Sequence, residues 1–155
     1  MDKYKLWSYL SFFLSGVAFV ALFLPLFRVV VWDTGKQGYL FLWGGHGEFG
    51  ASVPAVLYGI AGGWGLAGVV SLVYAGELLR RQSRSAIAWM NWAAFFLAME
   101  LIFLLVIAEE ILTDLRVQEL HADSFAQVGS WLGFLVLIGL LFLPGRARKA
   151  LFPRK

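Results

Sequence analysis

The sequence predicts an all-α membrane protein: a bundle of four transmembrane helices that carries a small extracellular β-hairpin. Hydrophobic residues make up 60% of the 155-residue chain and charged residues only 15%, against about 25% charged in ordinary soluble domains. The mean hydropathy is +0.74, so most of the apolar surface must face lipid. This composition excludes a cytosolic enzyme, a secreted disulfide scaffold and a disordered tail. The absence of cysteine also excludes disulfides and thiolate metal sites.

Four apolar stretches of the chain are predicted to cross the membrane, since a spanning helix needs about 20 mostly apolar residues. We expect them to form a single integral membrane domain over residues 1–155. Pro25 is predicted to end the first span, and Pro144 with Gly145 to end the fourth. The predicted spans cover residues 6–27, 54–79, 86–111 and 128–143.

The lysines and arginines divide unequally between the two sides of this bundle. Ten of the 13 precede the first span, join the second to the third, or follow the fourth. Because cations are retained on the cytoplasmic side, we expect a multi-pass plasma-membrane protein with both termini in the cytoplasm. The sequence pI of about 9.4 therefore reflects topology and attraction to anionic lipid, and nucleic acid is not an expected partner.

The segment after the first span predicts an extracellular β-hairpin over residues 28–43. A β-branched run over 28–33 and an aromatic run over 39–43 flank a turn-rich break at 34–38. The strand edges of such a hairpin favour pairing with a second copy or with another membrane protein. The candidate partner-contact residues are Trp32, Tyr39, Phe41 and Trp43.

Two further outer segments carry weaker patterns. The glycine-rich residues 44–50 are expected to form a flexible return to the second span. Residues 109–127 interleave acidic and apolar side chains, which predicts a helical extension of the third span that lies over the bundle.

The second predicted span is rich in glycine, and Gly59 and Gly63 stand four residues apart on one helix face. Small residues at this spacing let neighbouring backbones approach closely, which is how helices gain packing energy in lipid. We therefore predict that Gly59 and Gly63 pack helices together. A hinge or the lining of a substrate path is the functional alternative.

Glu100 is the ionisable residue that lies well inside a predicted span. An intramembrane carboxyl is costly, which makes it a functional candidate. Antiparallel register across residues 80–84 places Trp64 level with it, and no lysine or arginine is expected at that depth. Glu100 is predicted to hold helices together through a polar contact, or alternatively to act in a proton- or cation-coupled transporter.

Both histidines fall outside the membrane, and each has a carboxylate two residues further on. Imidazole with carboxylate suits zinc, copper or iron, so these residues are candidates for an outer-face metal site or a membrane enzyme. Solvated loop residues are the simpler interpretation, and we expect no bound metal or cofactor. The two pairs are His46 with Glu48 and His121 with Asp123.

Signatures of known catalytic sites are absent from the sequence. It contains no HExxH, no GxSxG, no P-loop and no GxGxxG after a strand. We therefore expect a non-enzymatic protein that acts through protein–protein contact, as an accessory subunit or in assembly or adhesion.

The string over residues 24–29, Leu-Pro-Leu-Phe-Arg-Val, is followed by Trp32 and later by Leu42 and Trp43. This segment resembles the first outer segment of the claudin/PMP22-type four-helix family, with its W and GLW signature. Phe41 stands where that family has the glycine of GLW, and the family's paired cysteines are absent. The resemblance implies a role in adhesion, barrier formation or support of another membrane protein.

Overall fold

The computed structural model describes residues 3–42, 44–46 and 55–152. Within these ranges the chain forms four helices: α1 (Lys3–Ala21), α2 (Ala55–Arg80), α3 (Ala86–Val117) and α4 (Val128–Leu151). Three of them are long and apolar enough to cross a membrane, namely α1, α4 and the part of α2 from Val56 to Arg80. Their outward surfaces carry many large apolar side chains, for example Phe13, Val70 and Leu141, each more than 60% exposed. Such a surface suits lipid rather than water.

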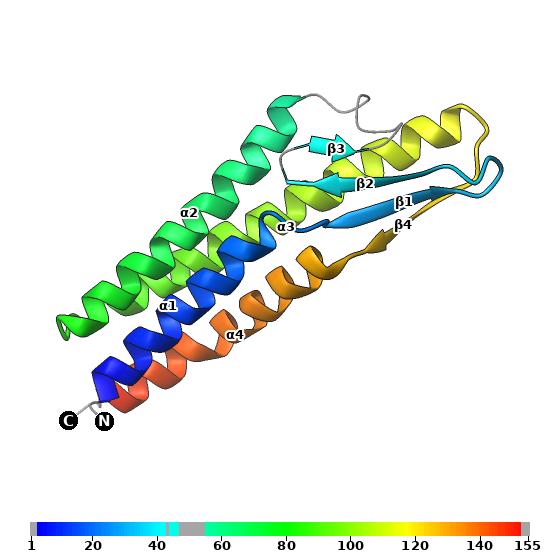
Figure 1. Cartoon of the computed structure of the whole chain (residues 1–155). Helices are drawn as coiled ribbons and strands as arrows, with labels where there is room; N and C mark the ends of the chain where they lie inside the picture. The colour runs from blue at the N-terminus through cyan, green and yellow to red at the C-terminus, as the bar shows by residue number, and fades with distance from the viewer. Residues whose placement is uncertain (1–2, 43, 47–54, 153–155) are drawn as a thin grey trace.

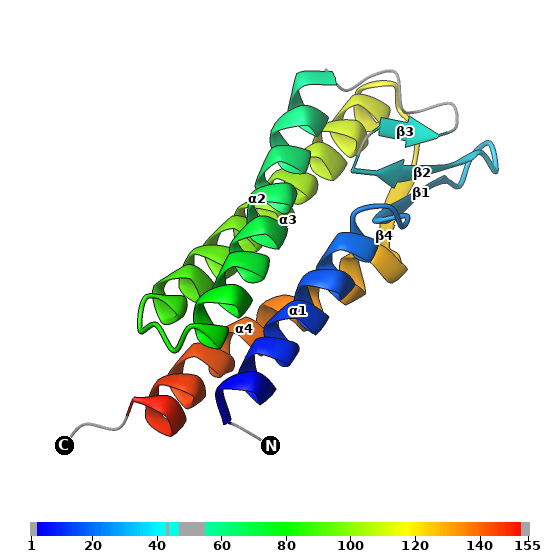
Figure 2. The same cartoon turned by 60° about the vertical axis from the view of Figure 1, so that its left-hand side comes forward.

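The helices lie side by side along their length, with the β-sheet at one end of the bundle (Figures 1 and 2). The start of α1, the end of α4 and the connection between α2 and α3 all lie at the opposite end. There the Tyr4 hydroxyl donates a hydrogen bond of 3.1 Å to the Leu151 carbonyl oxygen. Helices α1 and α3 each pack against both α2 and α4.

The sheet has four strands in the order β3-β2-β1-β4, and every neighbouring pair is antiparallel. The predicted hairpin is confirmed as β1 (Phe27–Val31) and β2 (Gln37–Phe41), joined by a turn in which Gly35 has a φ of +68°. Glycine adopts that backbone conformation at no steric cost, because it has no Cβ.

Two strands lie where the sequence predicts none. β3 (Gly44–His46) pairs with β2, so the first residues of the expected flexible return belong to the sheet. The helix α3 continues past residue 111 as expected but ends at Val117, and residues Ala122–Ala126 form β4 beside β1. The prediction of a helix through residue 127 is therefore wrong. The fold is a helical bundle with a small sheet rather than a bundle with one hairpin.

One face of the sheet packs against the outer half of α3. Val29, Val31, Leu40 and Leu42 are at most 3% exposed. They share one core cluster with side chains from α3, which include Ile107, Leu112 and Leu115. The extension of α3 beyond the predicted span therefore serves as the support on which the sheet rests.

Two helix ends differ from their predicted positions. The first helix ends at Ala21, before Pro25, because the chain must turn there to enter β1 at Phe27. The fourth helix does not stop at Pro144 and Gly145 but continues to Leu151, with Pro144 buried inside it. Proline is tolerated within membrane helices, where neighbouring groups compensate for the lost backbone bond.

Three serines on α1 form a line of hydrogen bonds to the backbone of α2. The Ser8, Ser11 and Ser15 hydroxyls donate to the carbonyl oxygens of Gly76, Leu72 and Val69 at 2.8, 2.7 and 3.3 Å. All three serines are at most 4% exposed. Small polar side chains that bond across a helix pair are a recognised means of association in lipid, so these serines hold α1 close to α2.

The glycines that allow close approach of the helices differ from the predicted pair. Gly59 and Gly63 are exposed, and a Cβ at either position would meet no described atom within 4 Å. Within the chain, the prediction that they pack helices is therefore wrong. The sequence could not select the inward glycines, because α2 is apolar on all sides and hydropathy alone does not show which face turns inward. The inward glycines include Gly68, where a Cβ would lie 2.7 Å from Leu97 Cγ on α3.

Candidate functional site

The face of the sheet turned away from α3 gathers the predicted contact residues. Arg28 of β1 lies between Tyr39 of β2 and Phe125 of β4 in the register of the three strands. Paired residues of antiparallel strands project to the same side, so these side chains form one row. We define the outer sheet face as Arg28, Trp32, Tyr39, Phe41, Asp123 and Phe125.

Aromatic side chains on this face are exposed rather than buried in the core. Trp32 is 59% exposed, Phe125 44% and Tyr39 37%, while Phe41 is half-buried. The rings of Trp32 and Phe125 meet edge to face, with centroids 6.4 Å apart. Of the four predicted contact residues, three lie on this face and the fourth, Trp43, lies outside the described residues.

The exposed tryptophan is held in place by β4. The Trp32 indole Nε1 donates to Asp123 Oδ2 at 2.8 Å, and the Trp32 backbone N–H donates to the His121 carbonyl oxygen at 2.9 Å. These contacts join residues about 90 positions apart in the chain. Because one hydrogen bond and a ring contact hold the indole and a second bond holds the Trp32 backbone, the side chain is positioned before a partner binds and loses less entropy on binding.

Arg28 contributes an unpaired donor to the same face. Its Nη2 donates to the Gln37 side-chain oxygen, but its buried Nε has no hydrogen-bond partner among the described residues. A buried donor without an acceptor is costly.

A second contact ties the β1–β2 turn to the segment before β4. The His121 backbone N–H donates to Asp33 Oδ2 at 2.7 Å, and His121 Nδ1 lies 3.0 Å from the same oxygen. The backbone bond, followed by the side-chain bond, holds the pKa of Asp33 below its ordinary value of 3.8. The turn beside the outer sheet face is therefore also anchored.

The strand order argues against the alternative of an outer-face metal site built from the two histidine–carboxylate pairs. His46 lies in β3 and Asp123 in β4, at opposite edges of the sheet with β2 and β1 between them. Three strand spacings of about 4.8 Å separate the edges by roughly 14 Å. Glu48 lies outside the described residues, and within the described part no group of three His, Asp or Glu side chains is placed to hold a metal ion. The described strands therefore do not bring His46 close to Asp123.

Glu100 is buried in the bundle, as expected, with 6% exposure. Its carboxyl lies against the backbone of α2 at Gly65, where a Cβ would be 2.9 Å from both Glu100 Cδ and Oε2. Among the described residues the carboxyl has no hydrogen-bond or ion-pair partner. The space that receives it exists because residue 65 has no side chain.

Trp64 does not join Glu100 at this site. Its ring stacks on Phe96 at a centroid distance of 5.6 Å and meets Phe95 edge to face. The predicted depth is correct to one residue, since Gly65 faces Glu100, but the Trp64 side chain packs into an aromatic cluster with Trp92. Its indole makes no hydrogen bond to Glu100 among the described contacts.

No protein-family model matches the chain, and no curated protein sequence matches it significantly. The candidate site is therefore defined by its own geometry.

Proposed function

We propose that this chain is a non-enzymatic, four-span plasma-membrane protein, with both termini in the cytoplasm, that acts through protein–protein contact. The outer sheet face is the contact surface, and the partner is a second copy or another membrane protein. The role is that of an accessory subunit or of an assembly or adhesion protein. The claudin/PMP22-type resemblance of residues 24–43 agrees with this class of function.

One observation carries the proposal: exposed aromatic rings and an arginine side chain share one face of the sheet. Tryptophan, tyrosine and arginine are the residues that dominate binding energy at protein interfaces. Here Trp32 and Tyr39 stand beside Arg28, whose Nε lacks an acceptor. A partner that packs on the exposed rings and carries a carboxylate beside the Arg28 guanidinium would suit this face.

The proposed orientation is supported by the distribution of charge in the fold. Lys3, Arg80, Arg84 and Lys149 belong to the end of the bundle opposite the sheet. The acidic residues Asp33 and Asp123 belong to the sheet end. Because cations favour the cytoplasmic side, this arrangement favours an extracellular sheet.

The test is site-specific photocrosslinking in native membranes. A photoreactive amino acid in place of Tyr39 is expected to capture either a second 17.3 kDa chain or a different membrane protein. The matched control is the same replacement at Tyr9 of α1, which is 62% exposed on the helical surface and is expected to capture neither. Arg28→Gln should weaken the capture at position 39. The proposal fails if position 39 captures nothing and the protein is monomeric in those membranes.

A second candidate function rests on Glu100, the buried carboxyl without a partner. Intramembrane acids mark proton and ion pathways in transporters. Glu100→Gln keeps the shape of the side chain and is expected to abolish proton or cation flux in proteoliposomes while the fold is retained. Wild-type proteoliposomes that show no flux would remove this candidate.

A further inference from the structure

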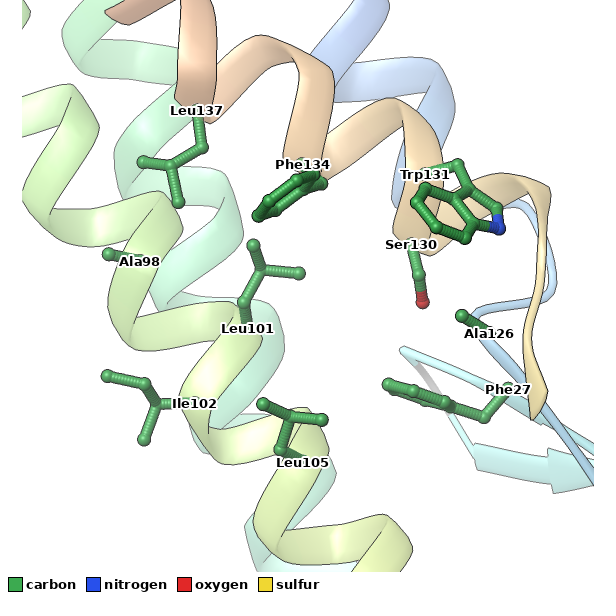
Figure 3. A pocket seen from close by; sticks show the side chains of 10 residues that line it. All are labelled: Phe27, Ala98, Leu101, Ile102, Leu105, Ala126, Ser130, Trp131, Phe134 and Leu137. Carbon is green, nitrogen blue, oxygen red and sulfur yellow. The ribbon is translucent and has the colours of Figure 1, made fainter. Parts of the chain in front are cut away.

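An apolar groove lies between α3 and α4, just below the sheet (Figure 3). Its volume is about 510 Å³. Phe27 of β1 and Ala126 of β4 close its outer end. The two long walls come from Ala98, Leu101 and Leu105 of α3 and from Trp131, Phe134 and Leu137 of α4.

The groove offers no free polar group to a ligand. Ser130 is the polar side chain in its lining besides the Trp131 indole, and its hydroxyl already donates to the Leu26 carbonyl oxygen at 2.6 Å. Figure 3 shows the indole nitrogen of Trp131 on the side away from α3. Because a polar ligand would lose its hydrogen bonds to water and gain none, the groove selects a wholly apolar occupant.

The groove opens sideways onto the apolar surface of the bundle. Leu105 is 58% exposed, Trp131 59% and Phe134 48%. In the membrane arrangement proposed above, hydrocarbon chains of the outer leaflet lie against this opening. Tryptophan is enriched at the depth of lipid headgroups. Trp131 therefore marks the end of the groove at which the acyl chain of a lipid would enter, with its headgroup beside the indole.

The groove is too short to hold a partner helix along the length of that helix. The eight residues from Ala98 to Leu105 rise about 10 Å along α3, whereas a membrane-spanning helix is about 30 Å long. A partner helix would also meet Phe27 and Ala126 at the closed end. A flexible hydrocarbon chain can bend to follow the short groove and its closed end, and it would contact both walls at once.

We propose that this groove binds one acyl chain of an outer-leaflet phospholipid. This inference rests on the membrane topology of the proposed function but not on the partner contact. The bound chain fills the space between α3 and α4 beneath the sheet, so the lipid acts as a packing element for the outer half of the bundle.

The experiment uses the full chain in nanodiscs of phosphatidylcholine that carries a diazirine in the middle of one acyl chain. After illumination, mass spectrometry locates the labelled residues. The label is expected to concentrate within residues 98–105 and 131–137. Even labelling of all exposed helix surfaces would overturn the proposal, because it would show annular lipid only.

A groove-filling variant sharpens the test. Ala98→Phe should lower labelling of these segments by about tenfold, the change expected when roughly two methylene groups leave an apolar site. The matched control Ala88→Phe, at an exposed position of α3 outside the groove, should label like the wild type. Unchanged labelling in folded Ala98→Phe protein would contradict the proposal, and the wild-type map decides the question if that variant does not fold.

Two outcomes separate this inference from the proposed function. Crosslinks from the groove walls to a second protein chain would show a helix as the occupant and overturn the lipid site. Capture of a partner at position 39 tests only the outer sheet face. The partner contact can therefore be disproved while the acyl-chain site holds, and the acyl-chain site can be disproved while the partner contact holds.

Discussion

Gly65 of α2 lies directly against the carboxyl group of Glu100 of α3, where a Cβ would be 2.9 Å from Glu100 Cδ. The same Cβ would lie 2.7 Å from Leu22 Cδ2, on the segment that follows α1. Three parts of the chain therefore meet at a position without a side chain. The buried carboxyl can be accommodated only because residue 65 is glycine.

Replacing Gly65 by alanine is expected to destabilise the bundle by about 1–3 kcal/mol, the usual cost of overpacking a core. Glu100 and Leu22 would both have to move. Unfolding in mixed micelles, followed by tryptophan fluorescence, measures the effect. The control is Gly63→Ala on the same helix, where nothing lies within 4 Å and no loss is expected. Equal stability of the two variants would contradict the packing described here.

Replacing Ser11 by alanine is expected to cost about 0.6 kcal/mol, the average for a hydrogen bond between membrane helices. The Ser11 hydroxyl donates to the Leu72 carbonyl oxygen at 2.7 Å. Ser15→Ala should cost less, because its bond to Val69 is longer, at 3.3 Å. The same unfolding measurement compares them, and a larger loss from Ser15→Ala would reverse the expected order.

The contact between Asp33 and His121 predicts a pH dependence at the sheet end. Because the pKa of Asp33 is lowered from 3.8 in the folded protein, its contribution is fully present above that value and is lost as pH falls through the lower, folded pKa. Nuclear magnetic resonance titration of the Asp33 carboxyl should show this. His121→Ala should leave part of the lowering of the Asp33 pKa, since the backbone N–H of residue 121 is its largest cause. A return to the ordinary value in that variant would show that the imidazole dominates.

The absence of cysteine allows a direct test of topology. Thr34→Cys lies in the β1–β2 turn and Ser85→Cys in the connection between α2 and α3, and both positions are exposed. In intact cells a membrane-impermeant maleimide is expected to label residue 34 at once, and residue 85 only after permeabilisation. The cysteine-free parent should remain unlabelled. The reverse pattern would place the sheet in the cytoplasm and remove the proposed orientation.

The sequence predicts the parts of this fold that depend on local pattern. Long apolar runs predict the four helices, and the β-branched run that begins at Arg28 predicts β1 and its hairpin with β2. The burial of Glu100 follows from its position within an apolar stretch.

Features set by long-range contacts are harder to predict. β4 has the sequence Ala-Asp-Ser-Phe-Ala, which lacks β-branched residues and has little strand propensity of its own. It forms a strand because β1 offers a free edge. Similarly, the contact faces of α2 depend on tertiary packing, so Gly65 could not be distinguished from Gly63 by hydropathy.

For the candidate site, the sequence indicates Trp32, Tyr39 and Phe41 because aromatic residues in an outer strand favour contact. Phe125 and Asp123 are missed because they join the face only through β4. The unpaired Nε of Arg28 has no signal in the sequence, since it depends on the register of three strands.

The pairing of β1 with β4 has a consequence for biosynthesis. Residues 27–31 cannot pair with residues 122–126 until the latter have been synthesised. At translation rates of about 5–20 residues per second this interval lasts roughly 5–20 s. During that time the nascent hairpin has an open edge, which can template pairing with other chains. The edge of β1 therefore stays open to pairing with other chains until residues 122–126 have been synthesised and have paired with it.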